Sequence, residues 1–242
     1  MARRRFFVGQ IHSQHAELNG EEAYHLTRVL RVERGQRFEI SDNQSVYLAE
    51  VTQAHKDRVL FSVIERVPSH PVPVRLTMLA GLVKFDRYEW ILEKGTELGV
   101  ETFVSVVTAR TEKGLDRAAE KRRTRWERIV LESAQQSRQE RLPVVAETTG
   151  FEEALRWQAD VRLLLDEFSG AVPLLRALPT GRGSTDRVAV MLGPEGGWTE
   201  SERERSTTAG WTPVSLGPRI LRSETAAVAA ASLVVAAWQE VS

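Results

Sequence analysis

The segment Leu192-Gly193-Pro194-Glu195-Gly196-Gly197-Trp198-Thr199 follows an apolar run, Arg187–Leu192, and precedes a helix signature. That signature is Thr199 followed three residues later by Glu202, a capping box that predicts a helix ending near Ala209. A buried strand, a glycine-rich loop and a capped helix in this order are typical of an α/β domain. Ligands in such domains gather where parallel strands end, and glycines let the backbone approach a ligand closely. The alternative is an ordinary strand-to-helix turn that needs glycine only for its backbone dihedrals, and spacing alone does not decide between the two.

The residues Gly193–Gly197, called the glycine loop below, differ from the two common nucleotide-binding loops. They lack the Lys-Ser/Thr pair of a phosphate-gripping loop and the G-x-G-x-x-G spacing of a dinucleotide-binding fold. The sequence therefore disfavours a kinase, an ATPase and a standard dehydrogenase.

A second loop, Gly217–Arg222, lies between a short predicted strand, Val214–Leu216, and a predicted helix, Ser223–Trp238. We call it the arginine loop. The start of a helix would account for Ser223 as a cap and for Glu224 near the positive end of the helix dipole. It does not account for Arg219 and Arg222. If the two preceding strands are neighbours, both loops lie at the same edge of the sheet.

In the rest of the back part of the chain, predicted strands alternate with predicted helices. Apolar and β-branched runs predict strands, and apolar residues at helical spacing predict helices, so we expect an α/β domain with a largely parallel sheet. Helix Ser223–Trp238 is apolar almost all round, so it should be buried in a core or an interface. The further expected strands are Val74–Val83, Thr102–Val107 and Val161–Leu165, and the further expected helices run from a cap at Asp86 to Gly99 and over 116–138.

The last turns of helix 116–138 carry Ser133-Ala134-Gln135-Gln136-Ser137-Arg138. These polar side chains could hydrogen-bond a ligand or a phosphate. The alternative is a solvated helix end.

The front part of the chain is separated by a proline-rich segment, Val67-Pro68-Ser69-His70-Pro71-Val72-Pro73, which predicts a linker. We therefore divide the chain into domains at residues 1–70 and 71–242. The front domain is expected to be a small β-barrel or sheet with strands Arg37–Ile40, Val46–Val51 and Val59–Val63 and one helix, Glu21–Val29.

The charges of the chain cancel in total but not by region. The 242 residues include 33 Lys+Arg and 33 Asp+Glu, and a net charge of zero argues against a polyanionic partner. However, residues 1–37 hold seven basic and four acidic side chains, and residues 110–141 hold ten basic and six acidic ones. Two basic stretches are therefore offset by acidic segments elsewhere, and nucleic acid stays a candidate partner.

Composition also excludes some chemistry. The chain has no cysteine, which excludes disulfides, thiol catalysis and cysteine-based zinc sites. Its five histidines have no metal-ligand spacing, so we expect no metal. The longest apolar stretch is about 13 residues, short of the roughly 20 that span a bilayer, and no signal peptide is visible. We expect a cytoplasmic protein that does not bind membranes.

Four motifs in order make the chain resemble the RsmE family of SPOUT-class methyltransferases. They are Lys84-x-Asp86-Arg87 with Glu93-Lys94-Gly95-Thr96-Glu97-Leu98-Gly99-Val100, then Ser133–Arg138, then Gly193–Gly197, then Leu216-Gly217-x-Arg219-Ile220-Leu221-Arg222-x-Glu224-Thr225-Ala226. The front signature, His25-Leu26-x-x-Val29-Leu30-Arg31, resembles that family's PUA-like RNA-binding domain. The match covers residues 5–238, and Gly95 stands where the family pattern has Ala.

The resemblance implies a fold and an activity. The fold would be a PUA-like β-barrel followed by an α/β domain with a trefoil knot. The enzyme would be a homodimer that methylates N3 of a specific uridine in 16S rRNA of the small ribosomal subunit. S-adenosylmethionine would be the cofactor and S-adenosylhomocysteine the product, with no metal. The expected cofactor-binding residues are Leu192, Gly193, Pro194, Glu195, Gly196, Gly197, Leu216, Gly217, Ile220, Leu221 and Thr225.

The chemistry of the expected reaction suggests further residues. Uracil N3 is weakly nucleophilic until it loses its proton, so the site must stabilise an anionic base or accept that proton. The catalytic candidates are Arg222, Arg138 and Lys94 as cations and Glu224 or Glu97 as the base. The basic stretches supply the RNA-binding candidates, Arg3, Arg4, Arg5, His25, Arg28, Arg31, Arg110, Arg122 and Arg125.

Two other functions stay open at this point. The chain could be a non-catalytic RNA-binding protein with a degenerate knot domain, which would bind RNA without the cofactor. It could also be an α/β enzyme that acts on a small nucleotide, with its basic stretches merely solvated.

Overall fold

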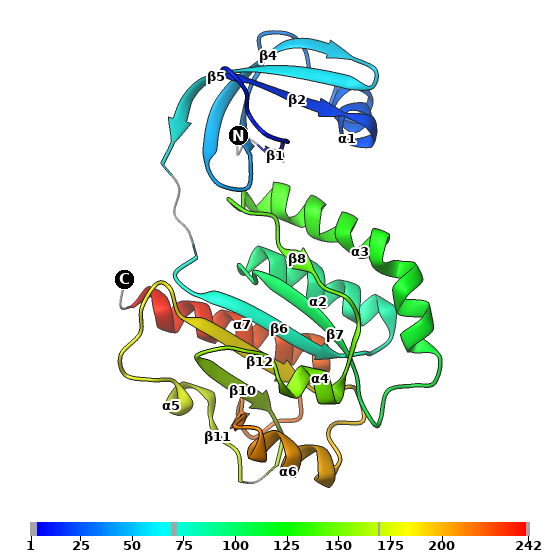
Figure 1. The fold of residues 1–242 in the computed structure, drawn as a ribbon, viewed down its shortest axis with the longest axis vertical. Coiled ribbons are helices and arrows are strands. Elements are labelled where there is room, and N and C mark those ends of the chain that lie inside the picture. The colour runs from blue at the N-terminus through cyan, green and yellow to red at the C-terminus, as the bar shows by residue number, and fades with distance from the viewer. Residues whose placement is uncertain (1–3, 69–71, 169, 241–242) are drawn as a thin grey trace. The chain divides into compact units, whose positions relative to one another are not determined.

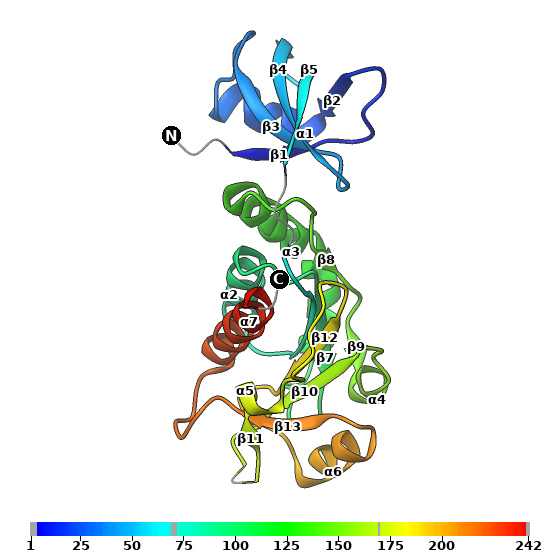
Figure 2. The same cartoon turned by 90° about the vertical axis from the view of Figure 1, so that its left-hand side faces the viewer.

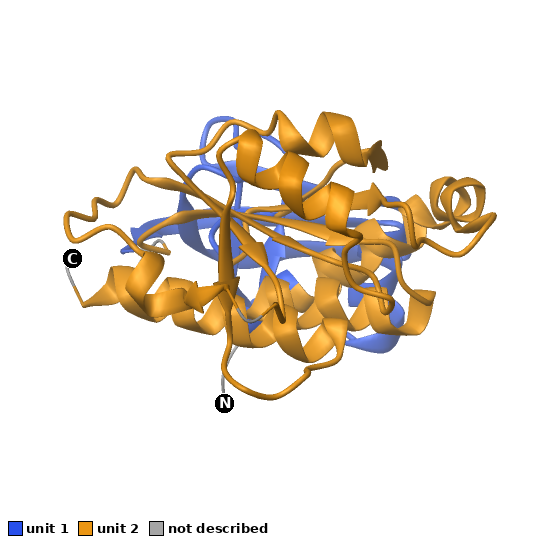
Figure 3. Cartoon of the chain, turned by 90° about the horizontal axis from the view of Figure 1, so that it is seen from below, with its two compact units in different colours: residues 1–71, 134–142 blue, residues 72–133, 143–242 orange. Residues whose placement is uncertain are grey.

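The computed structural model describes residues 4–68, 72–168 and 170–240, and the chain forms two compact units (Figures 1 and 3). The front unit is Met1–Pro71 together with Ala134–Leu142, and the back unit is Val72–Ser133 together with Pro143–Ser242. The expected linker lies partly outside the described residues, since Ser69, His70 and Pro71 are not among them.

The front unit is a curved five-stranded sheet with one short helical segment. The strands pair in the order β1-β3-β4-β5-β2, with β1 parallel to β3 and every other pair antiparallel. Its core contains Phe6, Leu26, Ile40 and Phe61, each fully buried. The elements are β1 (Arg5–Phe7), β2 (His15–Asn19), α1 (Gly20–Tyr24), a π-helical turn (His25–Val29), β3 (Arg37–Ser41), β4 (Val46–His55) and β5 (Arg58–Val67).

These elements confirm the three predicted strands and add two more. The expected helix over Glu21–Val29 is present, but its second half is π-helical. Strands β1 and β2 were not predicted, because one is very short and the other is half polar, His15-Ala16-Glu17-Leu18-Asn19.

The back unit is built on a parallel sheet in the order β11-β13-β10-β12-β6-β7-β8, with β9 also paired to β7. All these pairings are parallel, as expected. Its elements are β6 (Arg75–Gly81), α2 (Phe85–Glu97), β7 (Thr102–Val107), α3 (Leu115–Ser137), β8 (Val144–Val145), β9 (Thr149–Gly150), α4 (Phe151–Leu155), β10 (Val161–Leu165), β11 (Val172–Pro173), α5 (Leu174–Ala177), β12 (Arg187–Leu192), α6 (Glu200–Thr208), β13 (Thr212–Ser215) and α7 (Ser223–Gln239).

Helices cover both faces of this sheet, which is why its central strands are apolar throughout. Helices α2 and α7 lie on one face and α4 and α6 on the other (Figure 2). In β12 every residue after Arg187 is buried, as expected for a strand covered on both sides. The face under α4 and α6 is filled by Phe151, Trp198 and Trp211, among others.

The helix boundaries confirm two predictions and correct one. Thr199 caps α6, and the reciprocal bonds of the capping box with Glu202 are present. Gly99, with φ +87°, follows the end of α2 in the left-handed conformation that glycine tolerates best. The predicted cap at Asp86 is wrong: Lys84 is the N-cap residue of α2, and Asp86 lies in the first turn, where it favours the helix dipole instead.

A three-residue ion cluster holds part of the front unit together. Arg5, only 7% exposed, donates hydrogen bonds to Glu39 and to the Arg138 carbonyl oxygen, and the Arg138 guanidinium also pairs with Glu39. Burial alone raises the pKa of Glu39, but hydrogen bonds and charge from Arg5 and Arg138 outweigh it and hold this pKa below its usual range. The segment that follows α3 is thus tied to strands β1 and β3.

Replacing Glu39 with Gln should lower the free energy of unfolding at pH 7 by about 2 kcal/mol, because a buried guanidinium loses its charged partner. Since the Glu39 pKa is depressed, the carboxylate stabilises the fold fully above its unfolded pKa, and this stabilisation is lost as the pH falls through the folded pKa. The difference in unfolding free energy between the wild type and E39Q, measured by urea denaturation, should therefore begin to shrink as the pH falls below about 4.

Glu50→Gln is the matched control, since the Arg37–Glu50 pair on β3 and β4 is exposed. It should change the unfolding free energy by less than about 0.5 kcal/mol. A pH-independent difference between E39Q and the wild type would contradict the assignment.

Candidate functional site

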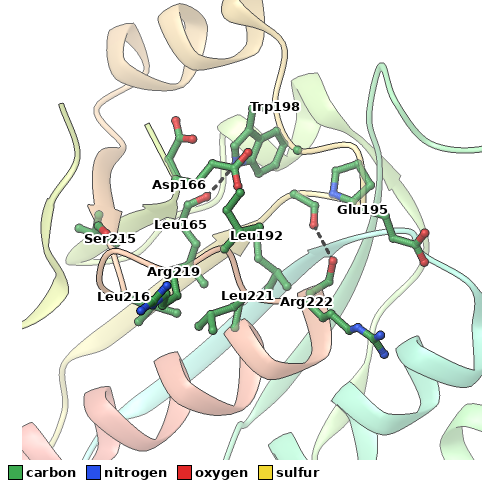
Figure 4. Close-up of a pocket in the computed structure, with 18 of the residues that line it drawn as sticks. Leu165, Asp166, Leu192, Glu195, Trp198, Ser215, Leu216, Arg219, Leu221 and Arg222 are labelled. Carbon is green, nitrogen blue, oxygen red and sulfur yellow. Dashed lines mark hydrogen bonds between the residues drawn. The ribbon is translucent and has the colours of Figure 1, made fainter. Parts of the chain in front are cut away.

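A cavity of about 280 Å³ lies in the back unit where β10, β12 and β13 end (Figure 4). These three strands are neighbours in the sheet, so the loops that follow them meet at one edge. The glycine loop follows β12, and the arginine loop follows β13 and leads into α7. The two loops that the sequence singled out therefore form one site.

A tight turn shapes the glycine loop. The Gly197 amide donates to the Pro194 carbonyl oxygen over 2.8 Å, and Gly197 has φ +66°, which favours glycine. The next residue, Trp198, is buried and donates its indole N–H to the Leu165 carbonyl oxygen over 2.9 Å. This bond fixes the far end of the loop to the end of β10.

The glycine loop also crosses the end of β6 at very short range. A Cβ atom at Gly81 would lie 2.6 Å from the Pro194 nitrogen and 2.9 Å from the Gly193 carbonyl carbon. Only a glycine at the end of β6 leaves room for this crossing. Beyond it, the Arg87 guanidinium of α2 pairs with the Glu195 carboxylate at 2.7 Å.

The arginine loop is joined to the glycine loop at one point. The Ser223 hydroxyl, at the first residue of α7, lies 3.5 Å from the Gly193 carbonyl oxygen and donates to it. At its other end, the Gly217 amide donates to the Ser215 hydroxyl, and Gly217 has φ +121°. Between these anchors the loop is open to solvent, and the Ile220 side chain is 82% exposed.

Comparison with known proteins shows which family has a similar sequence and fold. A family model described as an RNA methyltransferase domain matches residues 70–235, and one described as an RNA methyltransferase PUA domain matches residues 18–64. The ribosomal RNA small subunit methyltransferase E of Bacillus subtilis is 34% identical over 90% of this chain and 88% of its own length. The protein of the same name from Synechocystis is 33% identical over 86% of this chain and 69% of its own.

The chain belongs to the ribosomal RNA small subunit methyltransferase E family. The family resemblance drawn from the four motifs is thereby confirmed. The Neisseria gonorrhoeae member, solved bound to S-adenosyl methionine, is 29% identical and superposes with a TM-score of 0.85 over 99% of this chain and 98% of its own. A Legionella pneumophila protein solved with the same cofactor is 25% identical, with a TM-score of 0.88 over 98% of each chain.

Most residues predicted to bind the family's cofactor line the cavity, and two do not. Gly196 lies outside the lining and packs against Arg110, and Thr225 is an exposed residue on the first turn of α7. Those that line it are Leu192, Gly193, Pro194, Glu195, Gly197, Leu216, Gly217, Ile220 and Leu221.

The sequence did not identify the residues that other strands contribute to the cavity. They come mainly from the ends of β10 and β13. The sequence predicted both strands but not their order across the sheet, so it could not show which strand ends meet at the cavity. They are Leu165, Asp166, Glu167, Val214 and Ser215, together with Trp198 and Arg87.

Of the catalytic candidates, only Arg222 lines the cavity. Glu224 lies one residue beyond Ser223, and its Oε2 atom is buried with no hydrogen-bond partner among the described residues. On α2, Lys94 pairs with Glu93 at 2.7 Å and with Glu97 at 2.9 Å, and these bonds raise the pKa of Lys94.

The fifth candidate, Arg138, belongs to the front unit and is held by Glu39. Lys94 and Glu97 thus neutralise each other outside the cavity, and Arg138 is paired within the front unit. The roles predicted for these three residues stay predictions.

The RNA-binding candidates differ in how far their side chains are available. Arg4, Arg28 and Arg31 are exposed and His25 is half-buried, whereas Arg3 lies outside the described residues. Arg5 is the least available of them, because its guanidinium is buried against Glu39 and the Arg138 carbonyl group. Its role in RNA binding stays a prediction.

The candidates on the back unit already have protein partners. Arg122 and Arg125 of α3 both pair with Glu89, and together they hold the pKa of this carboxyl below its usual range. Arg110 donates to the Gly196 carbonyl oxygen. A phosphate would have to compete with these contacts.

The described residues contain neither a metal-binding cluster nor a membrane-spanning helix. Within the described residues, no group of three or more His, Cys, Asp or Glu side chains could hold a metal ion. In the same part of the chain, no helix has both the length and the apolar character needed to cross a bilayer.

Replacing Gly81 with Ala should displace the glycine loop, because the added methyl group overlaps the Pro194 backbone. We expect a loss of about 1–3 kcal/mol in unfolding free energy, the range typical of overpacking, measured by urea denaturation. Gly181→Ala is the control, since that exposed glycine has nothing within 4 Å of its added Cβ and an ordinary φ. Equal stability of the two variants would show that the loop yields freely.

Proposed function

We propose that this protein transfers the methyl group of S-adenosylmethionine to N3 of a uridine in 16S rRNA of the small ribosomal subunit. One observation carries the proposal: the glycine loop and the arginine loop, far apart in sequence, enclose one cavity at the ends of β10, β12 and β13. Family membership, relatives named for ribosomal RNA methylation and a relative solved with the cofactor support it.

The residues around the cavity fit S-adenosylmethionine. Leu165, Leu192 and Leu221 offer apolar walls for a flat heteroaromatic ring, and Glu167 supplies a carboxylate that favours a cationic ligand. The carboxylates of Asp166 and Glu195 already pair with Arg203 and Arg87. Gly193 and Gly197 line the cavity without side chains, so the glycine loop presents backbone to a ligand there. When bound, the cofactor supplies an electrophilic methyl group on a sulfonium.

The course of the chain supports a trefoil knot in the back unit, which we include in the proposal. After β13, at one side of the sheet, the arginine loop turns back to the glycine loop at Gly193. Helix α7 then crosses to pack on α2, β6 and β12. A knot would hold both loops of the cavity together without a separate lid.

A homodimer is part of the same proposal. Along α7, residues such as Ala230 and Val234 are buried, but Ser232, Leu233 and Val235 on the other face are only half-buried. On α2, Trp90 is 53% exposed. A second copy would cover this apolar surface.

We further propose an RNA-binding domain at residues 1–70, a methyltransferase domain at 71–242 and a cytoplasmic location.

The chemistry at N3 assigns work to Arg222. Loss of the N3 proton leaves negative charge on the uracil oxygens, and a guanidinium beside the cavity stabilises that charge. Glu224, with a buried carboxylate oxygen that lacks a hydrogen-bond partner among the described residues, is the candidate acceptor for the proton. Positioning of the base against the methyl donor supplies the rest of the barrier reduction.

The front unit offers a surface for the RNA. Arg28 and Arg31 are exposed, and the same stretch of chain exposes the apolar or aromatic side chains Tyr24, Val29 and Leu30. Cations for phosphates beside surfaces on which bases can pack are typical of RNA-binding sites.

The test of the function has two parts. Calorimetry should detect binding of S-adenosylmethionine to the full-length protein, and labelled methyl groups should enter 16S rRNA at a uridine N3. Small subunits and naked rRNA, both from a strain that lacks this modification, should be offered separately. RNA binding without cofactor binding would favour a non-catalytic RNA-binding protein, and turnover of free nucleotides would favour a small-molecule enzyme; either would overturn the proposal.

Replacing Arg222 with Ala should lower the turnover number about 100-fold or more, as expected for the loss of a donor to a developing anion. The dissociation constant for the cofactor should change less than about threefold, because the role proposed for Arg222 is toward the base. The turnover number of Arg222→Lys, which keeps the positive charge but not the forked guanidinium group, should lie between those of the wild type and R222A. Unchanged turnover in R222A would exclude Arg222 from catalysis.

A further inference from the structure

Arg110 reaches the glycine loop from a strand that does not border it. It follows β7, which is separated from β12 by β6, yet its guanidinium donates to the Gly196 carbonyl oxygen. The side chain also packs on this residue: a Cβ atom at Gly196 would lie 3.2 Å from the Arg110 Cδ atom and 3.3 Å from its Cβ atom. Arg110 thus contacts both the carbonyl group and the α-carbon side of one glycine.

A buried carboxylate fixes the backbone from which Arg110 projects. Glu202, 3% exposed, accepts the Ala109 amide on one oxygen, over 2.8 Å. Its other oxygen accepts the Thr199 amide over 2.8 Å and the Thr199 hydroxyl over 2.9 Å. The N-terminal cap of α6 is therefore also a bridge between the segment after β7 and the end of the glycine loop.

Two adjacent glycines make such an outside support necessary. Glycine has more backbone freedom than any other type of residue. A loop with Gly196 and Gly197 in succession would therefore lose much conformational entropy if it had to become ordered around a ligand. Gly81 limits the loop from below, Arg87 holds Glu195, and Trp198 holds the far end. Gly196 itself is held by Arg110.

We propose that Arg110 is a positioning residue for the cofactor, which orders the glycine loop through Gly196, and that Glu202 fixes it for this role. The inference rests on the proposed function, because it takes the cavity to be the S-adenosylmethionine site. It reassigns Arg110 from the RNA to the cofactor loop, without contact between Arg110 and the cofactor.

The test is calorimetry of S-adenosylmethionine binding to the full-length protein without RNA. Arg110→Ala should weaken binding about tenfold, because binding must then order Gly196. In a separate methylation assay with rRNA and saturating cofactor, the turnover number of R110A should stay within about threefold of the wild type. Arg110→Lys, which keeps a donor and a charge, should restore part of the affinity. Arg117→Ala removes an exposed arginine from the first turns of α3 and should leave cofactor affinity unchanged.

A second variant tests the contact from the other side. Gly196→Ala leaves the charge of Arg110 in place but presses on its side chain, and the φ of Gly196 is not positive. It should weaken cofactor binding in the same direction as R110A, with little change in melting temperature.

The possible outcomes separate the two proposals. If the wild type does not bind the cofactor, the proposed function fails. If the wild type and R110A bind it equally, only the positioning role fails. A raised KM for RNA with unchanged cofactor binding would return Arg110 to the RNA-binding residues and overturn the inference.

Discussion

The close approach of two backbone segments at Gly81 is the constraint on which the site depends. The loop that leaves β12 must pass over the end of β6 to reach the segments after β6 and β7, and a side chain at this crossing would meet the Pro194 nitrogen. Once the loop passes there, its contacts to Arg87, Arg110 and Glu202 become possible. The site is thus built by backbone proximity first and by side-chain chemistry second.

The same arrangement explains why the cavity draws on so many separate segments. In a parallel sheet each strand ends at the same edge, so neighbouring strands bring their following loops together however far apart they lie in the sequence. Here each of the three strand ends supplies one leucine to the apolar walls, the loop after β12 adds glycine backbone, and the loop after β13 adds arginines. The start of α7 then joins two of these loops through Ser223.

The sequence predicted those features whose cause is local. Continuous apolar runs identified β10 and β12 to the residue, and the Thr199–Glu202 spacing identified the start of α6. Lateral order in the sheet has no such local signal, so Leu165 and Asp166 could not be assigned to the cavity. Strand β2 was missed because its exposed face is polar and its apolar face too short to show alternation.

Arginine roles were the least predictable, for a physical reason. A guanidinium is charged wherever it lies, so sequence shows its charge but not its partner. Arg5 and Arg110 both belong to basic stretches, yet one is buried against Glu39 and the other supports a glycine. Arg28 and Arg31 also belong to a basic stretch, but their side chains are exposed to solvent. Charge by region therefore indicated a polyanionic partner without identifying the residues that contact it.

The division of the chain into units limits how its parts can be exchanged. The front unit includes Ala134–Leu142, a segment that lies far beyond the linker in sequence and begins inside the last turn of α3. Within it, Gln135 donates to Glu22 and Arg138 pairs with Glu39. A graft of residues 1–71 onto another protein would leave those two carboxylates without these partners. A transfer of the front unit that keeps these pairs would therefore require a discontinuous insert that includes Ala134–Leu142.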